Sequence, residues 1–337
     1  MEKKKLSKNQ IPIVKRPFVF LSKWRSLPPY EMISYILMYA SVPMLAFGII
    51  TYNIETIKII IFSILALYSG FFAALIWNDI TDADIDSVAH PDRPIPSGRI
   101  SKKKFFAIAL FFSATTFIFS FLVSVWCLIL VGAAALFVAF HDKYLKKRVK
   151  IPAYSEIFTP IQWVVVAIFG YLAIWTALPQ QSTLVVNMPV FENISTSMYE
   201  LQNMLLFVIF IYFADNAHDL PEGIHDAAGD RRLGVRTYAT SFGEKNAARV
   251  SFAMFFISGI LGVTLFLRTI LSPIFLVPFL AIWLYTMYYS YKLLKTDVKD
   301  MKEISSIVGR KGFNYFLFVF DLIFIDILIQ ILIFHYY

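Results

Sequence analysis

The sequence is poor in cysteine and in charged residues. Cys127 is its single cysteine among 337 residues, which excludes a disulfide between two positions of this chain. Charged residues make up 16% of the sequence and apolar residues 58%, whereas soluble domains carry about 25% charged residues. The composition therefore argues against a soluble globular domain and favours a polytopic membrane protein.

Long apolar runs are what the sequence has instead. Each is close to the roughly 20 residues that a helix needs to cross a bilayer. They span about 33–51, 57–77, 105–121, 124–140, 158–177, 201–214, 251–267, 272–290 and 314–334. The pattern predicts an all-α fold with nine transmembrane helices in residues 31–337, preceded by a basic segment, residues 1–30, that lies on the membrane surface.

Lysine and arginine are unevenly distributed between the connections. Of the 31 basic residues, all but Lys58 and Arg268 fall before the first run or in alternate loops. Cytoplasmic flanks hold such residues in excess, so the N-terminus is predicted inside the cytoplasmic membrane and the C-terminus outside. The net charge of +8 follows from this distribution. Neither nucleic-acid binding nor an obligatory protein partner is predicted.

A first cluster of acids follows the second apolar run, in the stretch "NDITDADIDSVAHPDRPIPSGRIS". Asn78, Asp82 and Asp86 are four residues apart, so on a helix they form a column of oxygen ligands, whereas Asp79 points elsewhere. Three prolines shortly afterwards are expected to end the helix.

A second cluster lies in the equivalent place after the sixth run, in "EGIHDAAGDRRLGVRTYATSFG". Glu222, Asp226 and Asp230 repeat the four-residue spacing. Ligation by oxygen alone favours Mg²⁺. His225 is interpreted as a hydrogen-bonding neighbour rather than as a zinc ligand.

Acids in loops are common, and either cluster alone is best explained as a solvated loop. Two such clusters at equivalent points, each next to an apolar helix, favour a functional site, because ionisable groups at the edge of the hydrocarbon are costly without a partner. Two Mg²⁺ ions flanked by basic residues suit a diphosphate, and the membrane suits a long hydrocarbon chain. Together they predict an enzyme that acts on a lipid diphosphate.

Both stretches resemble the signatures of the UbiA superfamily of intramembrane prenyltransferases. The first matches its Asn and two Asp at four-residue intervals, with an Arg-Pro and a Gly after them. "DAAGDRRLGVRT" matches the second signature. The resemblance implies a helical bundle around a central cavity open to the cytoplasm, and Mg²⁺-dependent transfer of a prenyl group from a prenyl diphosphate to a lipophilic acceptor.

The resemblance also assigns roles to residues. It implies that one Mg²⁺ binds Asn78, Asp82 and Asp86, and that a second Mg²⁺ binds Asp226 and Asp230, so that the four aspartates serve catalysis. Lys146 in "YLKKR" becomes a candidate diphosphate contact, with Lys143 and Lys147 close behind. Arg93 and Arg236 also fall at motif positions and are expected to hold the diphosphate or the fold. This sequence departs from the family's pattern at two places. It has Glu222-Gly223 where relatives have Lys-Asp, and Ser155-Glu156 where relatives have Gly-Asn.

The acceptor is the least determined part of the prediction. The motifs look most like relatives that prenylate geranylgeranylglyceryl phosphate in archaeal ether-lipid synthesis. An aromatic or tetrapyrrole acceptor, of quinone or chlorophyll type, and a UbiA-type terpene cyclase remain as alternatives, and a transporter is a more distant one. Asp321 and Asp326 in the last apolar run are left without a role, either lining a tunnel or pairing with polar neighbours.

Overall fold

The computed structural model describes residues 28–337 apart from 90, 146–148, 179–183, 187–193 and 336–337. Its elements are α2 (Pro29–Phe47), α3 (Ile54–Thr81), α4 (Ala83–Ala89), α5 (Lys102–Val123), α6 (Val125–Phe140), η3 (His141–Leu145), α8 (Tyr154–Phe158), α9 (Ile161–Ala177), β1 (Leu184–Val186), β2 (Ile194–Thr196), α10 (Met198–Leu233), α11 (Tyr238–Phe242), α12 (Glu244–Arg268), α13 (Pro273–Lys295), η4 (Val298–Asp300) and α14 (Met301–His335). The two short strands pair antiparallel. The predicted all-α architecture is confirmed. In the described part of the chain, the pair of β1 and β2 is the only sheet.

Eight helices in the described residues are long and apolar enough to cross a membrane. The segment predicted as another span, α6, is apolar but has 16 residues. At 1.5 Å per residue it covers about 24 Å, less than the roughly 30 Å of hydrocarbon. The count of nine spans, the side of each terminus and a cavity open to the cytoplasm therefore stay predictions.

The close junction of α5 and α6 has a local cause. Ser124, which separates them, has extended backbone angles, and its side chain accepts a hydrogen bond from the backbone N–H of Cys127 at 3.1 Å. A serine that caps the next helix in this way starts a new helix without a loop. The sequence expectation of two runs joined by almost nothing agrees with this arrangement.

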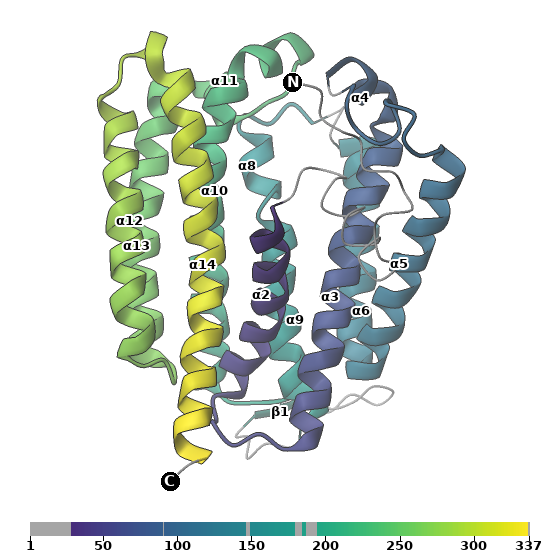
Figure 1. The fold of residues 1–337 in the computed structure, drawn as a ribbon, viewed down its shortest axis with the longest axis vertical. Helices are drawn as coiled ribbons and strands as arrows, with labels where there is room; N and C mark the ends of the chain where they lie inside the picture. The colour runs from purple at the N-terminus through teal and green to yellow at the C-terminus, as the bar shows by residue number, and fades with distance from the viewer. Residues whose placement is uncertain (1–27, 90, 146–148, 179–183, 187–193, 336–337) are drawn as a thin grey trace, which may run out of the picture.

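The helices form one bundle that runs along the long axis of the molecule (Figure 1). Helix α3 packs on α5, and α10 packs on α12 and α14. Between these groups α2 contacts α3, α9 and α14. Aromatic rings pack between the groups: Tyr35 of α2 stacks on Trp163 of α9 at 5.9 Å, and Phe316 of α14 makes an edge-on contact with Trp163 at 5.4 Å.

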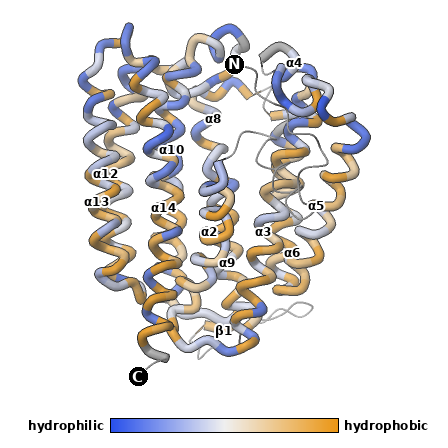
Figure 2. The backbone as a smooth tube through the Cα atoms, viewed as in Figure 1, coloured by the Kyte–Doolittle hydropathy of each residue, from blue (hydrophilic) through white to orange (hydrophobic). Residues whose placement is uncertain are grey.

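The outside of the bundle is apolar, and the polar residues gather at its ends. Leu136, Leu267, Val277 and Phe111 are each 65% exposed or more, which suits helices that face lipid rather than water. Figure 2 shows hydrophobic residues along the shafts and a hydrophilic end at α4 and α11. The carboxyl ends of α3 and α10, which carry the two acidic motifs, lie at that same end (Figure 1).

Candidate functional site

The first acidic motif lies where α3 stops and α4 begins. Asp82 caps α3 with a ψ of 7°, so the helix is interrupted at the middle residue of the predicted column. Its register nevertheless continues, because Asp82 N–H donates to Asn78 O at 2.9 Å and Asp86 N–H donates to Asp82 O at 2.8 Å. The three predicted ligands thus follow one another along a nearly helical backbone. As expected, the helix has ended before Pro91.

An arginine from the following turn neutralises this motif. Arg93 Nη1 donates to both carboxylate oxygens of Asp86 at 2.7 Å, and Asp86 is buried. The same nitrogen is 3.8 Å from a carboxylate oxygen of Asp79, which is 1% exposed. The expectation that Asp79 points elsewhere is wrong, because the turn after α4 folds back and brings Arg93 within reach of both acids.

The second motif lies on an unbroken helix. Pro221 does not interrupt α10, and the helix ends only at Gly234, which caps it with a φ of 72°, a left-handed conformation that glycine adopts without strain. The side chain of Asp226 is 69% exposed. Among the described residues no lysine or arginine forms an ion pair with Asp226 or Asp230, and the imidazole of His225 lies 4.0 Å from an oxygen of Asp226.

The basic residues around the second motif hold other partners. Arg236 donates to the backbone oxygen of Lys150 at 2.9 Å, and Arg231 pairs with Glu244 at 2.6 Å. Arg236 therefore ties the segment after α10 to the segment before α8, and its role as a diphosphate contact stays a prediction. Lys146 lies outside the described residues. The ring of His225 hydrogen-bonds the backbone oxygen of Lys302 at 3.0 Å, the role expected of a hydrogen-bonding neighbour.

Glu156 of α8 is a site residue that the sequence analysis treated only as a departure. One of its oxygens accepts a hydrogen bond from Tyr238 N–H at 2.7 Å, and the other is buried without a hydrogen bond from any described residue. A Cβ on Gly223 would lie 3.6 Å from an oxygen of Glu156. Helix α8 thus adds a carboxylate to the second motif that no spacing rule could reveal.

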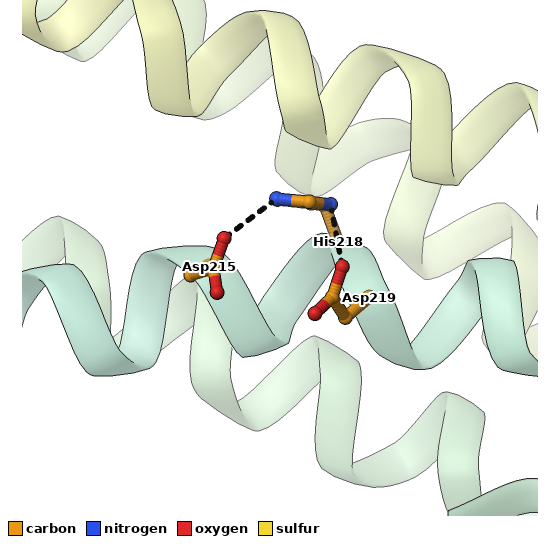
Figure 3. A group of neighbouring side chains, drawn as sticks. All are labelled: Asp215, His218 and Asp219. Carbon is orange, nitrogen blue, oxygen red and sulfur yellow. Dashed lines mark hydrogen bonds and ion pairs between the residues drawn. The ribbon is translucent and has the colours of Figure 1, made fainter. Parts of the chain in front are cut away.

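A buried polar cluster on α10 was also missed. His218 lies between Asp215 and Asp219, with its Nε2 3.1 Å from Asp215 Oδ1 and its Nδ1 3.4 Å from Asp219 Oδ1 (Figure 3). Asp215 and His218 are 1% and 4% exposed. The stretch "DNAHD" carries the signal, since residues three and four apart share a helix face, but it lay before the region matched to the second motif.

The two unassigned acids of the last helix have structural partners. Asp326 accepts hydrogen bonds from the backbone and hydroxyl of Ser272 at the start of α13, and from Gln330. Asp321 accepts a hydrogen bond from Ser34 at 2.7 Å. Of the two interpretations, pairing with polar groups of neighbouring helices therefore accounts for both residues.

The arrangement as a whole offers oxygen ligands from two helices at one end of an apolar bundle. The first group is held with an arginine, and the second is open and flanked by further carboxylates. Carboxylate and amide oxygens are the ligands that hard divalent cations such as Mg²⁺ take in proteins, so the donor set fits such ions. The apolar shafts beneath provide surroundings for a hydrocarbon chain.

Comparisons of the sequence with known families and proteins agree with the resemblance found in the two motifs. The UbiA prenyltransferase family matches residues 37–313. The chain is 28% identical to digeranylgeranylglyceryl phosphate synthase of Sulfolobus acidocaldarius over 50% of its own length, and that match spans about half, 52%, of the relative. It is 27% identical to the synthase of the same name from Methanobrevibacter smithii, over 73% of this chain and 80% of the relative.

Solved structures share the fold. A UbiA homologue from Aeropyrum pernix K1 superimposes with a TM-score of 0.61 at 18% identity, over 86% of this chain and 98% of the other. A UbiA homologue from Archaeoglobus fulgidus, bound to GPP and Mg²⁺, superimposes with a TM-score of 0.51 at 14% identity, over 88% and 99%. The family match covers most of the chain and includes both acidic motifs. The protein therefore belongs to the UbiA prenyltransferase family and is an integral membrane protein.

Proposed function

We propose that this enzyme transfers a prenyl group from a prenyl diphosphate to geranylgeranylglyceryl phosphate, with two Mg²⁺ ions bound at the two acidic motifs. The observation that carries the proposal is that both motifs lie at the same end of the apolar bundle (Figure 1). A prenyl diphosphate has a charged head and a hydrocarbon tail, so it suits a boundary between polar and apolar surroundings. By the distribution of basic residues this end faces the cytoplasm.

Each of the two motifs would hold one metal ion. Asn78, Asp82 and Asp86 would hold one ion, with Arg93 already beside Asp86 at 2.7 Å. Asp226 and Asp230 would hold the other ion. Their oxygens are available for it as far as the described residues go, because none of the lysines or arginines there forms an ion pair with them. The Archaeoglobus fulgidus homologue bound to GPP and Mg²⁺ supports the use of this ion and of a prenyl diphosphate.

The chain's own groups would favour departure of the diphosphate. Bound Mg²⁺ supplies positive charge that stabilises the diphosphate as the allylic C–O bond breaks. Arg93 can add a guanidinium to the same phosphate oxygens when its hold on Asp86 loosens, since arginine recognises phosphate and carboxylate with the same donors. The acceptor hydroxyl then bonds to the allylic carbon and loses its proton.

The choice of acceptor rests on the relatives. Digeranylgeranylglyceryl phosphate synthases from two archaea are 27–28% identical to this chain. Among the acceptors that fit the motifs, geranylgeranylglyceryl phosphate is therefore favoured over an aromatic ring or a tetrapyrrole. Arg236 and Lys146 remain the proposed further contacts of the diphosphate.

The test uses purified protein in detergent, Mg²⁺ and labelled geranylgeranyl diphosphate, with geranylgeranylglyceryl phosphate or a panel of aromatic acceptors. The wild type is compared with Asp82→Ala, Asp226→Ala and a control, Asp84→Ala, which removes an exposed acid of the first motif. We expect label on geranylgeranylglyceryl phosphate, lost in the first two variants and kept in the control.

Each other result has a distinct meaning. Label on an aromatic acceptor alone would refute the assigned acceptor and keep the transferase. Release of diphosphate with a cyclised hydrocarbon and no adduct would identify a cyclase. Activity that survives in both Asp82→Ala and Asp226→Ala would refute the proposed metal sites.

A further inference from the structure

The cluster of Asp215, His218 and Asp219 forms a compact group of ligand atoms inside the bundle. One ligand atom from each of the three side chains lies within 4.8 Å of the other two. Glu222 follows one turn later, with an oxygen 3.9 Å from His218 Nδ1. All four side chains therefore lie on one face of α10.

Helix α14 covers this face. Phe313 and Phe316 lie against the imidazole, with ring centroids at 5.2 and 5.9 Å. A Cβ on Gly312 would be 2.7 Å from His218 Cβ, so the glycine is what lets the two helices approach. Figure 3 shows the imidazole on the side of α10 that faces α14. Asp215 and His218 are therefore buried beneath α14, whereas the side chains of Asp219 and Glu222 are 19% and 52% exposed.

Asp215, His218 and Asp219 are distinct from Asp226 and Asp230, and Glu222 lies between the two groups on α10. His218 precedes Asp226 by eight residues, which is about 12 Å along a helix. A single ion bound by Asp226 and Asp230 cannot also contact the imidazole over that distance.

Negative charge exceeds positive charge around the imidazole. Glu222 and, from α8, Glu156 add carboxylates to those of Asp215 and Asp219. The guanidinium of Arg310 on α14 is paired with the buried Glu31 of α2. Asp215 Oδ2 and His218 Nδ1 are buried, and neither has a hydrogen bond from the described residues. Ionisable groups inside membrane proteins are usually paired with one another. Among the described residues, the imidazole of His218 is the only basic group that pairs with Asp215, Asp219 and Glu222, so at most one positive charge faces three carboxylates.

We propose that Asp215, His218 and Asp219 bind a divalent transition-metal ion, with Glu222 as a fourth ligand. One imidazole nitrogen with carboxylate oxygens is a donor set for Zn²⁺ or Mn²⁺, whereas Mg²⁺ takes oxygen ligands. The ion would balance the buried carboxylates and fix the two turns of α10 that lead to Asp226. This site is additional to the proposed diphosphate-binding ions and does not depend on them.

The test measures bound metal rather than turnover. Tag-free full-length protein in detergent is stripped with a chelator, exposed to Zn²⁺ or Mn²⁺ with Mg²⁺ in large excess, freed of unbound ions and assayed by mass spectrometry for metal content. We expect the wild type to retain one equivalent of the transition metal. His218→Gln should bind it at least about tenfold more weakly.

Two variants serve as controls. His225→Gln changes the partly exposed histidine two turns later on the same helix, and Asp226→Ala opens the second motif. Both variants should retain one equivalent of the transition metal. That result would separate this site from the second acidic motif, and it does not depend on the outcome of the prenyl-transfer assay.

Two results would overturn the proposal. If the wild type retains neither metal in the presence of Mg²⁺, the imidazole carries a proton on each nitrogen and bridges the two carboxylates without an ion. If His225→Gln loses the metal as His218→Gln does, the ion belongs to the exposed motif. Should His218→Gln not purify as a monodisperse protein, Asp219→Asn, which changes a partly exposed side chain, decides in its place.

Discussion

The two acidic motifs occupy equivalent places in the chain but are built differently. The first breaks its helix at Asp82 and keeps a buried carboxylate, Asp86, bound to Arg93. The second keeps its helix whole and leaves Asp226 mostly exposed. The same four-residue spacing therefore gives one site with an arginine counter-charge and one that, within the described part of the chain, pairs with no lysine or arginine. Bound Mg²⁺ should matter more for the charge balance of the second site than for that of the first.

The largest effect is expected at the open site. Asp226→Asn keeps the size of the side chain but removes a charge that no lysine or arginine of the described residues balances. Prenyl transfer should fall by about a hundredfold or more, the usual loss when one charge-stabilising group is removed from an active site. The measurement is the initial rate with labelled geranylgeranyl diphosphate at saturating Mg²⁺. A rate within threefold of wild type, with Asp84→Asn as control, would mean that the second motif holds no essential ion.

The next largest effect tests the first acidic motif through the stability of the protein. Arg93→Ala leaves Asp86 and Asp79 buried without their guanidinium, and should lower the free energy of unfolding by about 3 kcal/mol. Mg²⁺ should restore part of this loss, since the ion can replace the guanidinium. Thermal unfolding in detergent, with and without Mg²⁺, measures both effects. Arg99→Ala is the matched control, because Arg99 is an exposed arginine of the same loop.

A stability loss in Arg93→Ala that Mg²⁺ does not reduce would contradict this account. The contrast between the motifs would then be one of packing alone. Asp86 would be a structural residue rather than a ligand.

A smaller effect should come from the helix behind the second motif. Gly312→Ala places a Cβ 2.7 Å from His218 Cβ and 2.6 Å from Phe255 Cζ, so α14 must move away from α10. Overpacking of this kind costs about 1–3 kcal/mol. Thermal unfolding is compared with Gly132→Ala, whose new Cβ would have no neighbour within 4 Å. Equal stability of the two variants would show that the contact of α10 with α14 adapts freely.

The sequence predicted the fold better than it predicted the surroundings of the site. Apolar runs near 20 residues identify helices because the bilayer sets their length, and the four-residue spacing identifies both motifs because a helix repeats with that period. The burial of Asp79 against Arg93 depends on how the turn after α4 folds back. Such a contact joins segments through tertiary structure and leaves no periodic trace.

Glu156 and His218 escaped prediction for related reasons. Glu156 reaches the second motif from α8, and its partner Tyr238 is 82 residues away. His218 is on the same helix as the motif, but its burial is decided by Gly312 and Phe313 of α14. Local spacing shows which residues share a face, and only packing shows what that face meets.

The smallest predicted effect uses Glu156 to sharpen the contrast between the motifs. Glu156→Gln keeps an oxygen that can accept the hydrogen bond from Tyr238 N–H, but removes a carboxylate that lies beside Gly223 of α10, one turn before Asp226. With less negative charge at the open site, Mg²⁺ should bind there about fivefold more weakly, an effect of about 1 kcal/mol across a partly solvated distance. The measurement is the Mg²⁺ concentration that gives half-maximal prenyl transfer, with Glu55→Gln, an exposed acid at the start of α3, as control. Because Glu156 lies beside the second motif and not beside the first, the same change should leave the Mg²⁺-dependent stability of Arg93→Ala unaltered. If Glu156→Gln instead altered both, the two motifs would share one electrostatic environment, and their difference in structure would not be a difference in how they hold metal.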